Sequence, residues 1–161
     1  MNKKDLDPLS KSLTIGQMLE RTTPVSTPKH NFKNFDEAKL WAKKNIVGTY
    51  KNVHSNEDIS VSGRAIKKYL SASAVLKSAD KDAHLSALTQ LPALIETSIL
   101  KETYQDKNHN LDIKEIQRFY GAIDYEHNVY PVKITVKAYP VGTSNAYSYE
   151  VMEIESPIIT T

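Results

Sequence analysis

The sequence contains no cysteine in its 161 residues. Disulfides, thiolate zinc sites and cysteine nucleophiles are therefore excluded. It also has no apolar run close to the roughly 20 residues that a transmembrane helix requires, and its basic N-terminal stretch lacks the apolar segment of a signal peptide. We therefore expect a soluble, cytoplasmic protein that makes no membrane contact, although a piece of a longer polypeptide would have the same features.

An excess of charge of one sign is missing as well. The 21 Lys and Arg residues and the 19 Asp and Glu residues leave a formal net charge of only +2. A protein that coats duplex DNA is usually more basic, so we expect any contact with nucleic acid to come from a local patch. The hydrophobic content of 40% and the charged content of 25% are typical of a globular protein, and the length favours one domain.

The signatures of several enzyme classes do not occur either: there is no Walker loop, GxGxxG, GxSxG or HExxH. The segment Asp106–Asp112 offers oxygen ligands at calcium-loop spacing, but Leu111 stands where such a loop needs glycine and Gln117 where it needs glutamate. The five histidines are scattered, with no pair at ligand spacing on one predicted element. We therefore predict neither a metal site nor a cofactor.

The chain divides into a tail and a domain. Residues 1–30 are rich in Ser, Thr, Pro and Lys, which is typical of a flexible tail or linker. Residues 31–157 form the predicted domain, and its first helix follows a capping box at Asn34 and Glu37. Pro92 divides the last helical region and starts a new helix. Helical spacing of apolar residues predicts helices over 35–47, 63–70 and 80–99.

The clearest strand is Tyr130–Tyr139, where the two faces alternate strictly. Its apolar face must be covered, whereas Lys133, Thr135 and Lys137 form a cationic and hydroxylic face that suits an anion. In the last strand the alternation slips at Val151 and Met152, which predicts either a β-bulge or the end of strand pairing. We predict an α+β domain with N-terminal helices packed on one face of a roughly four-stranded antiparallel sheet. Its strands cover 100–104, 117–125, 130–139 and 147–155, and a small hairpin covers 49–53 and 58–61.

Three cations of the second predicted helix fall on one face, because Arg64, Lys67 and Lys68 are spaced i, i+3 and i+4. Cations in the first turn of a helix oppose the helix dipole. A bound anion would remove this conflict, since the helix start offers free N–H groups. The alternative is that Arg64 simply extends into solvent.

Among the histidines, His84 alone lies within a clearly predicted element. It is a candidate general acid or base facing the sheet, or else a helix-edge histidine without a task. Together with cations, hydroxyls and aromatic rings, such a residue suits the metal-free cleavage of an RNA phosphodiester. The alternative is a cationic sheet face that is merely solvated. The candidate set from these residue types is Arg64, Lys67, His84, Arg118, Tyr120, Lys133, Thr135, Lys137 and Ser148.

Three phrases of the chain resemble a known group of domains. Residues 58–155 contain ISVSGRAIKKYLS, HLSALTQLPALIETSIL and YGAIDYEHNVYPVKITVKAY. This segment resembles the phage- and mobile-element-associated nuclease-like domains of the barnase/EndoU/colicin/RelE (BECR) fold, and it is especially similar to the large polyvalent protein-associated domains. The resemblance implies helices packed on a four-stranded antiparallel sheet and a toxin-like ribonuclease activity that needs no metal.

The residues and the resemblance together predict a metal-independent endoribonuclease-like domain that acts on single-stranded RNA or tRNA. His84, Arg64, Lys67 and Tyr120 are the predicted catalytic residues. A non-catalytic module that binds nucleic acid or a partner (immunity) protein is the first alternative, and a structural interaction domain is the second. Convergence of His84, Arg64 and the face of Lys133 in one cleft would favour the first two. The predicted substrate contacts are Ser62, Arg118, Tyr130, Lys133, Thr135, Lys137 and Ser148.

Overall fold

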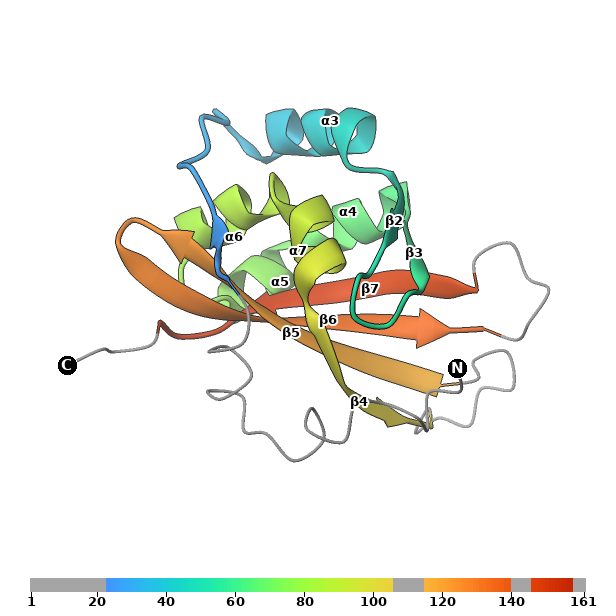
Figure 1. Cartoon of the computed structure of the whole chain (residues 1–161). Coiled ribbons are helices and arrows are strands. Elements are labelled where there is room, and N and C mark those ends of the chain that lie inside the picture. The colour runs from blue at the N-terminus through green and yellow to red at the C-terminus, as the bar shows by residue number, and fades with distance from the viewer. Residues whose placement is uncertain (1–22, 106–114, 140–145, 158–161) are drawn as a thin grey trace.

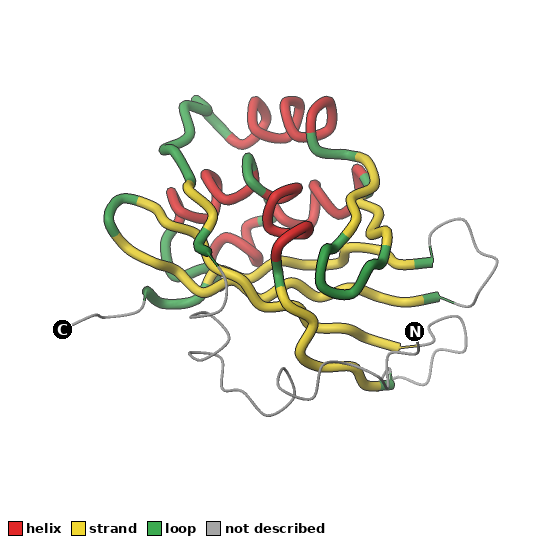
Figure 2. Tube along the Cα trace, in the orientation of Figure 1, coloured by secondary structure: helices red, strands yellow, loops and turns green. Residues whose placement is uncertain are grey.

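The computed structural model describes residues 23–105, 115–139 and 146–157. Within these ranges, helices cover one face of a single sheet, and the β2–β3 hairpin stands at one side (Figures 1 and 2). The elements in chain order are β1 (Val25–Ser26), α3 (Phe35–Asn45), β2 (Gly48–Lys51), β3 (Asp58–Val61), α4 (Gly63–Tyr69), α5 (Ala72–Lys77), α6 (Lys81–Leu88), α7 (Leu91–Thr97), β4 (Ile99–Tyr104), β5 (Glu115–Tyr125), β6 (Asn128–Ala138) and β7 (Tyr147–Ile154).

The sheet is larger and more mixed than the sequence predicts. In the described residues, seven strands form it in the order β1-β5-β6-β7-β3-β2, and β4 also pairs with β5. The run β4-β5-β6-β7 is antiparallel, but β1 pairs with β5 and β3 pairs with β7 in parallel. The predicted BECR-like arrangement with a roughly four-stranded antiparallel sheet is therefore wrong. The parallel pairs join segments far apart in sequence, such as Ser60 and Ser148, and a period-two pattern carries no information about such pairings.

Local signals located most elements well. The Asn34 side chain accepts a hydrogen bond from the Glu37 N–H at 2.9 Å and caps α3. Ser62 caps α4 in the same way, by accepting from the Ala65 N–H at 3.1 Å. Pro92 stands in the first turn of α7, so the predicted division at this proline is confirmed. The predicted hairpin is present as β2 and β3.

The two faces of β6 are the predicted ones, since its Tyr130, Val132, Ile134, Val136 and Ala138 side chains are all buried. The predicted bulge in β7 is also present. Across the ladder, Thr135 pairs with Val151 and Val136 pairs with Tyr149, so one extra residue of β7, Glu150, lies between them.

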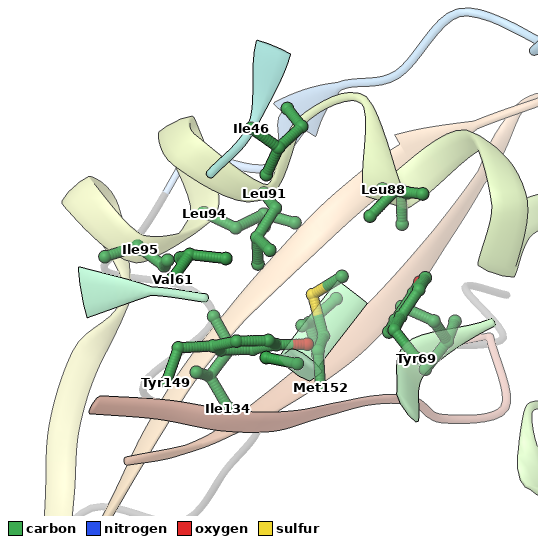
Figure 3. Close-up of a cluster of buried hydrophobic side chains, with 14 of the residues drawn as sticks. Ile46, Val61, Tyr69, Leu88, Leu91, Leu94, Ile95, Ile134, Tyr149 and Met152 are labelled. Carbon is green, nitrogen blue, oxygen red and sulfur yellow. The ribbon is translucent and has the colours of Figure 1, made fainter. Parts of the chain in front are cut away.

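The core lies between the helices and this sheet. Leu88 of α6 and Leu91 and Leu94 of α7 lie in one core cluster with Ile134 of β6 and Met152 of β7 (Figure 3). All five side chains are almost completely buried, and each contributes about 1.5–3 kcal/mol of transfer free energy. The core also anchors α4, because Ile66 and Tyr69 are buried in it, and α4 thereby packs against β7.

Candidate functional site

A groove of about 980 Å³ lies between α4 and the neighbouring ends of β6 and β7. The α4 side supplies Arg64, Lys67 and Lys68, and β6 supplies Lys137. We call it the cationic groove. Among its described lining residues, four are basic and one, Glu150, carries a carboxylate. Hydroxyl groups line it as well, from Ser62, Ser71, Tyr139 and Ser148.

The amphipathic character of α4 places its cations in the groove. Ile66 and Tyr69 point into the core, so the exposed Arg64, Lys67 and Lys68 lie on the other side of the helix. Only Arg64 lies in the first turn of α4, which contains no acidic residue, whereas Lys67 and Lys68 lie in the last turn, where the helix dipole favours cations. The predicted conflict with the dipole therefore concerns Arg64 alone and is wrong for Lys67. Among the described residues, neither Arg64 nor Lys67 forms an ion pair.

The bulge residue Glu150 connects the two sides of the groove. Its Oε1 lies 3.0 Å from Lys68 Nζ and 3.3 Å from Lys137 Nζ. Burial raises the pKa of the Glu150 carboxyl, but the two ammonium groups outweigh burial and hold the pKa below its usual value. Glu150 is therefore charged at neutral pH and positions Lys68 and Lys137 beside each other.

A smaller pocket of about 110 Å³ adjoins the cationic groove. Lys68 and Ser71 line both of them, so the two spaces share a wall. We call it the side pocket. Apart from those two residues, its lining comes from α5 and its C-terminal cap, from His84 of α6, and from the stretch 151–154 of β7.

His84 is only 1% exposed, and the ring of Tyr69 covers one of its faces. The two rings are stacked, with centroids 3.9 Å apart. His84 Nε2 lies 2.8 Å from the Tyr69 carbonyl oxygen, and the Tyr69 hydroxyl donates to the His84 carbonyl oxygen. Burial lowers the pKa of His84 more than the bond to the Tyr69 carbonyl raises it, so the ring is neutral at pH 7.

Two predicted residues of β5 lie outside the cationic groove, next to β4. The Tyr120 hydroxyl donates to Glu102 Oε1 at 3.0 Å, and burial, followed by this bond, raises the pKa of Tyr120 to about 12. The Arg118 guanidinium lies over the ring of Tyr104, 5.2 Å from its centroid. Both residues therefore contact β4 rather than α4.

The remaining predicted residues belong to β6. Tyr130 is buried in the core, where its ring lies 6.3 Å from that of Tyr125. Lys133 Nζ forms an ion pair with Glu153 Oε2 at 2.8 Å. Thr135 lies beside the bulge, opposite Val151 of β7. None of the three β6 residues lines the cationic groove or the side pocket.

The structure thus brings together five of the eleven predicted residues and places His84 in the adjoining side pocket. Of the predicted residues on the same face of β6 as Lys133, Lys137 lies beside α4 in the cationic groove. Sequence reasoning missed Glu150, because only the bulge and the approach of α4 give it two cationic neighbours. Lys68 was within reach of sequence reasoning, because it shares a helix face with Arg64. The residues brought together are Ser62, Arg64, Lys67, Lys137 and Ser148.

The described residues contain no group of three His, Cys, Asp or Glu side chains that could hold a metal ion. The Asp106–Asp112 segment, with its calcium-like spacing, lies outside the described residues. None of the described helices is long and apolar enough to cross a membrane.

Comparison with known proteins identifies the family. A family model described as "Large polyvalent protein-associated domain 3" matches residues 29–147, which is well over half of the chain. No curated protein and no solved structure matches this chain.

Proposed function

The chain belongs to the large polyvalent protein-associated domain 3 family, and we propose that this domain binds single-stranded RNA through the cationic groove. Family membership supports the expected place among phage- and mobile-element-associated domains. The observation that carries the proposal is the meeting of Arg64, Lys67 and Lys68 of α4 with Lys137 of β6 around one open groove.

The charge of the groove suits a phosphate backbone. Glu150 offsets one of the four positive charges, and Arg64 and Lys67 have no carboxylate partner among the described residues. Phosphate contacts from such cations supply most of the affinity of a protein for nucleic acid, through the release of counterions. Serine hydroxyls at 62, 71 and 148 add neutral donors that also bind phosphate oxygens.

A single strand suits the groove better than a duplex. Tyr139 lines the groove and is partly exposed, so its ring is available for stacking on an unpaired base. Single-strand binding sites combine a positively charged track for the backbone with such aromatic surfaces. The ribose hydroxyl of RNA adds a further partner for the serine side chains.

The test is RNA binding by charge-removal variants. A fluorescent single-stranded RNA is titrated with the wild type, with Arg64→Ala/Lys67→Ala, and with a control, Lys39→Ala/Lys44→Ala, which removes the same charge from α3. We expect the groove variant to lose at least ~10-fold in affinity and its salt slope to fall by about 1.4, since each phosphate contact on a single strand contributes about 0.7. Equal losses in both variants, or no binding by the wild type, would refute the proposal.

Cleavage of the bound RNA is the second candidate function. The observation that favours it is the shared wall of the groove and the side pocket, because it places His84 next to the proposed phosphate track. The same samples, incubated in EDTA and in Mg²⁺, are run on a denaturing gel. If His84 acts as a general acid or base, cleavage persists in EDTA and falls at least ~100-fold in His84→Ala. Intact RNA under both conditions leaves binding alone.

A further inference from the structure

We propose that the side pocket receives one unpaired pyrimidine base of the RNA strand, and that His84 Nδ1 accepts a hydrogen bond from this base. The inference rests on the proposed function, since the cationic groove would hold the phosphates of the same strand. It adds a second recognition element, because phosphate contacts carry no sequence information, whereas a base pocket does.

The hydrogen bonds of His84 determine which ring nitrogen is the acceptor. Nε2 lies 2.8 Å from the Tyr69 carbonyl oxygen, and a carbonyl oxygen only accepts, so Nε2 carries the proton. In the neutral ring Nδ1 therefore keeps a free lone pair. Nδ1 is buried and has no hydrogen-bond partner in the described part of the chain, and a buried acceptor of this kind is normally satisfied by a donor.

The side pocket is large enough for the edge of one ring and no more. Its volume is about 110 Å³, which is smaller than the cavity of about 150 Å³ that is known to hold benzene, so a single ring enters it only in part. Ala74 of α5 and Val151, Met152 and Ile154 of β7 supply apolar surface for the faces of a ring. A pyrimidine fits such a space better than a purine, and both cytosine and uracil carry an N–H donor on the edge that pairs in a duplex.

The side pocket is connected with the cationic groove. Lys68 and Ser71 line both spaces, so a nucleotide with its phosphate at Lys68 has the side pocket within reach of its base. The pocket admits one base and no base pair. This geometry selects an unpaired nucleotide and excludes a duplex.

The test compares oligonucleotides that share a phosphate backbone and differ in their bases. The wild type is titrated with oligo-C, oligo-U, oligo-A and an abasic oligomer of equal length. We expect the pyrimidine oligomers to bind about tenfold more tightly than the other two, the equivalent of one net hydrogen bond. Equal binding of all four oligomers would overturn the inference while leaving the proposed function standing. No binding of any oligomer would refute the proposed function itself.

Variants separate the pocket from the rest of the surface. Ala74→Phe fills the side pocket, whereas Ala72→Phe places the same ring on an exposed position of α5 that does not line it. We expect Ala74→Phe to abolish the pyrimidine preference and Ala72→Phe to retain it. His84→Phe keeps a ring against Tyr69 but removes the acceptor, so it is expected to lose the preference too. A preference that persists in Ala74→Phe contradicts the inference, even if His84→Phe fails to fold. A preference that persists in a folded His84→Phe contradicts the proposed hydrogen bond to Nδ1.

Discussion

Gly121 provides a sharp test of the packing between β4 and β5. It lies in β5 opposite Val132 of β6. Ser98, the residue just before β4, packs closely against it. A Cβ atom at position 121 would lie 2.5 Å from Ser98 Oγ and 3.5 Å from Ser98 Cβ. The first distance is impossible without movement, and the second is an ordinary van der Waals contact. Gly121→Ala therefore creates a clash with one atom of one neighbour.

Two opposing contributions set the change that Gly121→Ala makes in the free energy of unfolding. Overpacking a buried site costs about 1–3 kcal/mol, and Ser98 is completely buried, so its hydroxyl has little room to move. Alanine is favoured over glycine within a strand by about 0.5–1 kcal/mol. We expect Gly121→Ala to lower the free energy of unfolding by about 1–2 kcal/mol. Ser98→Ala removes the clashing atom, and because this buried hydroxyl has no hydrogen-bond partner in the described residues, its loss is expected not to destabilise the fold.

A double-mutant cycle measures the coupling. Denaturant unfolding, followed by circular dichroism, is compared for the wild type, both single variants and Gly121→Ala/Ser98→Ala. The double variant is expected to be at least as stable as the wild type, since the clash is gone and the strand preference for alanine remains. If Gly121→Ala costs the same whether residue 98 is serine or alanine, the close approach is not the cause and the reasoning is refuted.

Two further predictions concern polar side chains. Asn52 is fully buried and donates to the carbonyl oxygens of Ile95 and Ser98, each at 2.7 Å, so Asn52→Ala is expected to lower the free energy of unfolding by about 3 kcal/mol. The control Asn45→Ala changes an exposed asparagine and should cost less than ~0.5 kcal/mol. Equal costs for the two variants in denaturant unfolding would contradict this account. Glu150→Gln is expected to cost about 0.5–1 kcal/mol at pH 7, since ion pairs that solvent still partly reaches contribute little. Because the pKa of Glu150 is lowered in the folded state, this cost is present above the usual carboxyl pKa and disappears as the pH falls through the lowered value; an equal cost at pH 7 and pH 3 would show that the ion pairs do not cause it.

Some of the missed elements are too short to produce a pattern. β1 has two residues, and residues 1–30 as a whole resemble a linker in composition. α5 has six residues and buries none of them, so it lacks the apolar stripe that reveals a helix. The parallel pairing of β3 with β7 was missed for another reason, since no local periodicity reports which strand lies beside which.

In the candidate site, too, local features were predictable from the sequence and contacts between distant segments were not. The shared helix face of Arg64 and Lys67 was predictable from their spacing, as was the separate strand face of Lys137. Their meeting was not, because it depends on α4 packing against β7 and on the bulge at Glu150. His84 is the clearest case: the sequence predicted either a general acid or base facing the sheet or a helix-edge histidine without a task, whereas the structure buries its ring against Tyr69 of α4.

The amino-acid sequence by itself determined what depends on neighbours along the chain. Helix caps at Asn34 and Ser62, the break at Pro92 and the two faces of β6 follow from hydrogen bonds and side-chain periods that span only a few residues. Tertiary structure alone decided the seven-stranded mixed sheet, the cationic groove and the burial of His84. These features arise from contacts between distant segments, and their free energy depends on the packing of whole surfaces rather than on any local pattern.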